Sequence, residues 1–201
     1  DITVSDGEAR ETAPLVIRVT PTEATPVATI IATPDFPVMP GQVVSLAVRG
    51  DGFLPITGRK LFVDGVEVVL DGDGRARVTV SDPGRVMIEA MVTDRAGREG
   101  RAEAVIRVRD PDDMDPPQVA LASPDHPVTG PLVLVGHVLD SNLDEWRLDI
   151  IHLASGQRTT LSGGGSTGDL DVMLDPAEFA AGFYKLHLTA RDIAGRLAQA
   201  E

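Results

Sequence analysis

The chain has 201 residues, no cysteine and a formal net charge of −13. This length suits one large domain or two of about 100 residues, and the missing cysteine excludes disulfides, thiolate metal sites and a cysteine nucleophile. The negative charge argues against a nucleic-acid partner, and no apolar run approaches the roughly 18 residues that would predict membrane insertion.

The first predicted element is a hairpin. Asp6 and Gly7 form a turn signal, and "LVIRV" at residues 15–19 matches "AVIRV" at residues 104–108. Residues 1–22 therefore read as the last hairpin of a preceding domain. Because the chain begins at Asp1 rather than Met and shows no signal peptide, we expect it to be part of a longer polypeptide.

Residues 23–110 are predicted to form one β-sandwich. Apolar residues recur at a spacing of two, which is the period of a strand with one buried face. Asp64 and Gly65 lie between two apolar runs and predict a two-residue hairpin loop. The predicted strands cover residues 27–33, 42–50, 59–63, 66–70, 75–80, 85–94 and 102–109.

Residues 111–201 repeat this unit, so that "VTDRAG" and "TARDIAG" both end a strand in an Asp-x-Ala-Gly turn. Around Pro176 a single helical turn is predicted. The predicted strands cover residues 117–122, 131–139, 144–152, 157–161, 168–173, 183–191 and 196–200. Seven short strands in each unit predict an all-β protein, with tandem seven-stranded antiparallel sandwiches joined by a short acidic, proline-rich linker.

The second unit carries residues typical of an immunoglobulin domain. Gly182-x-Tyr184-x-Leu186 resembles the G-x-Y-x-C pattern of immunoglobulin strand F, with leucine in place of cysteine. Trp146 resembles the core tryptophan of strand C, and its alternation with Leu148 predicts that it faces inward. The resemblance implies Ig-like sandwiches and a tyrosine-corner hydrogen bond from Tyr184.

The phrases "GHVLDSNLDEWRL" (136–148) and "AGFYKLHLTARDIAG" (181–195) also resemble bacterial Ig-like modules of large surface or secreted repeat proteins, including YD-repeat (Rhs-type) proteins. This resemblance implies a location outside the cytoplasm, at the cell surface or in a secreted protein. It implies a non-catalytic spacer or presentation module whose partners are neighbouring domains of the same polypeptide. Adhesion to a protein or glycan receptor is the alternative.

The linker "RDPDDMDPP" concentrates carboxylates between the two units. These belong to Asp110, Asp112, Asp113 and Asp115. Carboxylates so close repel one another unless they are solvated or neutralised, and Ca²⁺ takes roughly six to eight oxygen ligands. The linker resembles the Ca²⁺-binding end of a cadherin repeat, which would add Asp94 to the ligands. It departs from the asparagine-rich cadherin pattern, so a solvated linker stiffened by its prolines is the alternative.

No motif predicts catalysis. Ser166 formally matches G-x-S-x-G, but it lies in a glycine-rich loop with no helix following. The four histidines show no zinc-binding spacing. We therefore predict that the chain is not an enzyme and requires no cofactor, with Ca²⁺ as the ion that the linker would take.

Overall fold

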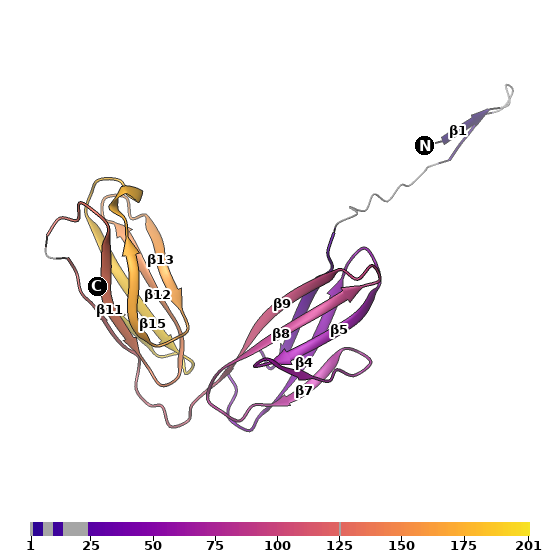
Figure 1. The fold of residues 1–201 in the computed structure, drawn as a ribbon, viewed down its shortest axis with the longest axis horizontal. Coiled ribbons are helices and arrows are strands. Elements are labelled where there is room, and N and C mark those ends of the chain that lie inside the picture. The colour runs from indigo at the N-terminus through magenta and orange to yellow at the C-terminus, as the bar shows by residue number, and fades with distance from the viewer. Residues whose placement is uncertain (1, 6–9, 14–23, 125) are drawn as a thin grey trace.

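The computed structural model describes residues 2–5, 10–13, 24–124 and 126–201, which are almost entirely β-structure (Figure 1). An antiparallel hairpin of β1 (Ile2–Ser5) and β2 (Arg10–Ala13) comes first. The turn predicted at Asp6 and Gly7 and the "LVIRV" segment lie outside the described residues. Two groups of seven strands follow, and each group forms a three-stranded and a four-stranded sheet.

The first group, purple to magenta in Figure 1, is the first sandwich. Its three-stranded sheet has the order β3-β4-β7, with β3 (Val27–Thr33), β4 (Val43–Asp51) and β7 (Arg75–Thr79). Its four-stranded sheet has the order β6-β5-β8-β9, with β6 (Val66–Val68), β5 (Ile56–Val63), β8 (Gly84–Asp94) and β9 (Glu99–Val108). All neighbouring strands are antiparallel.

The second group, orange to yellow in Figure 1, is the second sandwich and has the same sheet orders. Its three-stranded sheet is β10-β11-β14, with β10 (Gln118–Leu121), β11 (Leu132–Leu139) and β14 (Gly168–Leu174). Its four-stranded sheet is β13-β12-β15-β16, with β13 (Arg158–Gly164), β12 (Leu143–His152), β15 (Tyr184–Asp192) and β16 (Leu197–Ala200). One 3₁₀ turn, η1 (Pro176–Glu178), is capped by Asp175, whose side chain accepts from the N–H of Ala177.

Each sandwich buries its own apolar core, because alternate residues of both sheets point inward. Leu46 of β4 and Leu61 of β5 meet in the first core, and Leu134 of β11 and Leu148 of β12 meet in the second. All four side chains are at most 1% exposed. The all-β fold and its antiparallel strands are therefore as predicted, with strand ends that differ by up to three residues.

The two predicted Asp-x-Ala-Gly turns are confirmed. Gly97 and Gly195 have φ angles of 78° and 88° and donate to the carbonyl oxygens of Asp94 and Asp192. Positive φ at these positions favours glycine, since a Cβ would be strained there. The Tyr184 hydroxyl donates to Ala180 O at 2.8 Å, as a tyrosine corner requires.

Trp146 packs against the second core but is only partly buried. Its indole Nε1–H donates to Ser166 O at 3.1 Å. The ring therefore lies at the margin of the core, facing inward as predicted, and it also holds the 164–168 loop in place. Ser166 is thus part of a packed loop that connects β13 with β14.

Candidate functional site at the junction of the two sandwiches

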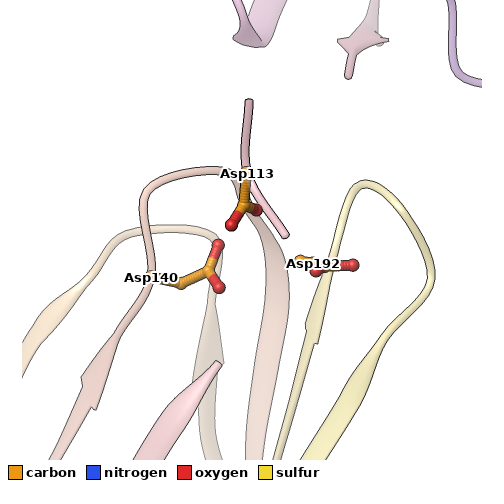
Figure 2. A group of neighbouring side chains, drawn as sticks. All are labelled: Asp113, Asp140 and Asp192. Atoms are coloured by element: carbon orange, nitrogen blue, oxygen red, sulfur yellow. The ribbon is translucent and has the colours of Figure 1, made fainter. Parts of the chain in front are cut away.

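Three aspartates converge where the linker enters the second sandwich. Asp113 comes from the linker, Asp140 follows β11, and Asp192 ends β15. One carboxylate oxygen from each lies within 4.8 Å of the others, and Figure 2 shows the three side chains approaching from separate segments. We call these three residues the acidic cluster.

Arg196 lies beside two members of the acidic cluster. Its Nη2 is 2.7 Å from Asp113 Oδ2, and its Nε is 2.5 Å from Asp192 Oδ2. Burial lowers the pKa of Arg196, but the hydrogen bond with Asp192 and the three surrounding negative charges raise this pKa by more. Three negative charges and one positive charge leave a formal charge of −2.

Asp140 is the member of the acidic cluster without a guanidinium contact. Its Oδ1 accepts from the backbone N–H of Asn142 at 2.7 Å. Burial, followed by the charges of Asp113 and Asp192, raises the pKa of Asp140 above its ordinary value, against the lowering by Asn142 and Arg196. The folded chain therefore holds this proton to higher pH than the unfolded chain does. As pH rises through the folded pKa, ionisation of Asp140 disfavours folding, and a bound cation would offset this cost.

The acidic cluster includes only one of the predicted calcium ligands, Asp113. Asp110 instead uses its Oδ1 to accept from the backbone N–H of Asp112 at 2.9 Å, which is a local turn. Asp112 and Asp115 are exposed to solvent. The structure therefore does not bring the four linker carboxylates together around one point.

Asp94 is separated from the linker by the length of the first sandwich. The linker leaves from Val108, which pairs with Gly84 at the start of β8, whereas Asp94 ends that strand. At about 3.3 Å per residue, the two ends of this ladder are roughly 30 Å apart. The predicted grouping of Asp94 with the linker aspartates is not observed. Asp94 lies at the turn between β8 and β9, whereas the linker begins at the other end of β9.

The carboxylate of Asp94 is used within its own turn. It accepts from the backbone N–H groups of Ala96 and Arg98, at 2.8 and 3.0 Å, and from Arg98 Nε at 2.8 Å. Burial raises the pKa of Asp94, but these hydrogen bonds and the Arg98 charge lower it by more, so that its pKa falls below the ordinary value. This side chain stabilises the turn.

Polar contacts join the two sandwiches next to the acidic cluster. Asn142 is buried; its Nδ2 donates to Val108 O at 3.2 Å, and its Oδ1 accepts from the Asp110 N–H at 2.9 Å. Asp144 is also buried and accepts from Arg107 Nε at 2.5 Å and from Arg191 Nη2 at 3.1 Å. Both residues of the second sandwich therefore bond directly to the end of the first.

Arg85 completes this junction. Its Nη1 donates to Asp144 O at 2.7 Å. A Cβ built on Gly165 would lie 1.4 Å from that same Nη1, so Arg85 occupies space that only a glycine leaves open. The junction is thus packed as well as hydrogen-bonded.

The sequence reasoning missed most of these residues, although one signal was present. Asp192 is the repeat counterpart of Asp94, and the turn at Asp192 faces the linker that precedes its own sandwich. The position of the hairpin turn, which places Asp94 far from the linker, therefore places Asp192 close to it. No local pattern marks Asp140 and Asn142, which lie in the connection between β11 and β12, or Asp144, the second residue of β12.

Within the described ranges, no helix is both long and apolar enough to cross a membrane. No protein-family model matches the chain, and no curated protein matches it either. Similar solved structures include carbohydrate-binding modules of the β-sandwich superfamily, with 12% identity and a TM-score of 0.41, covering 89% of this chain and 96% of that one.

Two further similar structures are modules of larger bacterial proteins. The fibronectin(III)-like modules of Clostridium thermocellum CbhA show 13% identity and a TM-score of 0.36, covering 86% of this chain and 90% of that one. A 1.5-MDa bacterial ice-binding adhesin shows 16% identity and a TM-score of 0.29, covering 86% of this chain and 62% of that one. With TM-scores below 0.5, these likenesses carry no argument about function. None of the three is named as a YD-repeat or cadherin protein, so those two resemblances stay predictions from the sequence.

Proposed function

We propose that the chain is a non-catalytic spacer of a larger bacterial surface or secreted protein, in which two sandwiches are held in a fixed relative orientation. The observation that carries this proposal is the pair of buried polar side chains, Asn142 and Asp144, bonded to the first sandwich. A buried polar group left without a partner costs about 1–3 kcal/mol, so separation of the sandwiches is disfavoured unless water replaces these bonds. A spacer requires such resistance to bending.

Removing both junction side chains should loosen the arrangement. In the double variant Asn142→Ala and Asp144→Ala, we expect small-angle scattering to show a broader distribution of interdomain distances, with each sandwich still folded. The exposed pair Asp112→Ala and Asp115→Ala, which leaves the junction intact, serves as the control. Identical scattering from the junction variant and the unmodified chain would contradict a role of these bonds in setting the orientation.

The acidic cluster supports a second candidate function, in which Ca²⁺ stiffens the junction. Carboxylate oxygens are the ligands that Ca²⁺ prefers, and the formal charge of −2 matches the ion. Asp113, Asp140 and Asp192 would supply the oxygens, and the Arg196 guanidinium would have to move aside from Asp113. The chemistry of this donor set therefore fits the ion, and the arginine competes with it.

Calorimetric titration separates these two candidates. If Ca²⁺ binds, we expect a dissociation constant of about 10⁻⁴–10⁻³ M, as in extracellular modules, and a loss of about tenfold or more for Asp140→Asn. Asparagine at this position keeps an acceptor for the Asn142 N–H and removes only the charge. Asp112→Asn is the matched control in the linker and should bind as the unmodified chain does. If the unmodified chain released or absorbed no heat at millimolar Ca²⁺, the second candidate function would be wrong, and the spacer without Ca²⁺ would be the only candidate of the two to stand.

A further inference from the structure

The outer faces of the two three-stranded sheets carry opposite charges at equivalent positions of their edge strands, β7 and β14. The backbone N–H of Val48 in β4 donates to the carbonyl oxygen of Gly74, which directly precedes β7, and the repeat counterpart Val138 pairs with Gly168 at the start of β14. Counting from these glycines, Arg75 corresponds to Asp169 and Arg77 corresponds to Asp171. In both strands these side chains point away from the core, because the residues between them point inward.

The outer face of β3-β4-β7, which we call the basic face, holds guanidinium groups that form no ion pair with any described residue. Arg49 projects from β4 next to Arg75 and Arg77, and the three line a trough of about 1190 Å³. Over the described part of the chain, none of the three guanidinium groups has a carboxylate within 4.0 Å. Asp71 and Asp73 also line the trough, and the Asp71 Oδ1 accepts from the backbone N–H groups of Asp73 and Arg75.

The basic residues of the second sandwich, unlike those of the basic face, all form ion pairs. Every arginine and lysine between residues 111 and 201 forms an ion pair with a carboxylate: Arg147, Arg158, Lys185, Arg191 and Arg196. The first sandwich, in contrast, leaves the guanidinium groups of the basic face, among others, without a carboxylate partner in the described part of the chain. Such groups are available to an acidic partner.

The outer face of β10-β11-β14, which we call the acidic face, has the complementary properties. Asp169 and Asp171 are exposed on β14, and within the described ranges neither has an ion-pair partner. Beside them lie exposed apolar side chains, which are Val133, Val135, Leu139 and Met173 at 42%, 64%, 48% and 62% exposed. The basic face likewise exposes Val27 at 64% and Val43 at 52%. Each face thus combines exposed apolar side chains with a pair of like charges two residues apart on its edge strand, and the basic face also carries Asp51, Asp71 and Asp73.

We propose that the basic face of one copy of this chain packs against the acidic face of a second copy. Arg75 and Arg77 are two residues apart along β7, which spaces them by about 7 Å. Asp169 and Asp171 on β14 have the same spacing, so the two pairs of charges can face each other. Two Arg75–Arg77 rows, or two Asp169–Asp171 rows, would repel each other, so the pairing is between the first sandwich of one copy and the second sandwich of the other. This selectivity follows from the reversal of charge at equivalent positions.

The size of the faces favours a reciprocal dimer. Three strands about 4.8 Å apart and some seven residues long give each face an area of roughly 300 Å² in projection. A stable interface buries about 800 Å² on each partner, so one face alone is too small, and two faces per copy approach that value. In the reciprocal dimer each copy uses both of its faces.

Charge reversal tests the proposal on the complete 201-residue chain. Sedimentation equilibrium of the unmodified chain should show a dimer that weakens as NaCl is raised, because the paired charges are screened. The variants R75D/R77D and D169R/D171R should each weaken self-association by about tenfold or more, since each then opposes like charges. A mixture of these two variants should form a 1:1 heterodimer, and the chain with all four substitutions should dimerise again.

This recovery separates charge pairing from damage to the fold, which thermal melts of each variant check independently. A salt-sensitive assembly larger than a dimer would overturn the reciprocal arrangement. An unmodified chain that stays monomeric at all accessible concentrations would overturn the proposal. So would the four-fold variant if it stayed monomeric while the unmodified chain dimerised. Binding of a sulfated polysaccharide to the monomer, lost in R75D/R77D, would instead assign the basic face to an anionic glycan.

Discussion

Leu148→Ala should lower the free energy of unfolding of the second sandwich by about 3–5 kcal/mol and leave that of the first sandwich unchanged. Leu148 is fully buried at the centre of β12 and faces Leu188, also fully buried, on β15. Truncation leaves a cavity between the two sheets. The sheets cannot move together to fill it without disturbing the hydrogen bonds between their strands. The two cores contain no residue in common, so the cost should stay in one sandwich.

Trp146 allows this expectation to be measured. It is the only tryptophan of the chain and lies in the second sandwich, so its fluorescence reports the unfolding of that sandwich, whereas circular dichroism reports both. Leu148→Ala should shift the fluorescence transition to lower denaturant concentration. Leu61→Ala, at a fully buried position on β5 of the first sandwich, should shift part of the dichroism transition and leave the fluorescence transition in place.

An exposed position gives the control. Val135 is 64% exposed, so Val135→Ala should change the free energy of unfolding by at most about 0.5 kcal/mol. If Leu61→Ala moved the fluorescence transition as far as Leu148→Ala does, the two sandwiches would unfold as one unit. The predicted division into residues 23–110 and 111–201 as separate domains would then be wrong.

The strands could be predicted because their information is local. An inside–outside alternation such as that of β4, where Val44, Leu46 and Val48 are buried and the residues between them are more exposed, is visible in the sequence alone. The turn at Asp64 and Gly65 could be predicted for the same reason: both residues adopt the positive φ that the loop needs.

The acidic cluster could not be predicted in full because its information is topological. Asp113, Asp140 and Asp192 are far apart in the sequence and meet only because three segment ends face the same linker. The density of aspartates in the linker predicted a group of carboxylates there, but only Asp113 joins the acidic cluster, whereas Asp112 and Asp115 stay exposed to solvent. The strand order determines at which end of a sandwich a turn lies. This order places Asp94 at the end of the first sandwich that is far from the linker.

Gly100→Ala should destabilise the first sandwich by about 2–4 kcal/mol, although only one methyl group is added. Gly100 lies buried in β9, where a Cβ would be 1.9 Å from Pro26 O and 2.8 Å from Pro26 C. These are backbone atoms just before β3, so no side-chain rotation can relieve the overlap. Reduced entropy of the unfolded chain favours alanine by about 0.4–1 kcal/mol, which is too little to compensate.

Gly72→Ala is the matched control in the same sandwich, because a Cβ there would have no atom within 4 Å. The control should unfold close to the unmodified chain, whereas Gly100→Ala should unfold earlier by dichroism with its tryptophan transition unchanged. The repeat counterpart of Gly100 is Ala198 in β16, which already carries a Cβ. The close approach of β3 to β9 is therefore a property of the first sandwich alone, and a Gly100→Ala variant as stable as Gly72→Ala would mean that β3 does not approach β9 so closely.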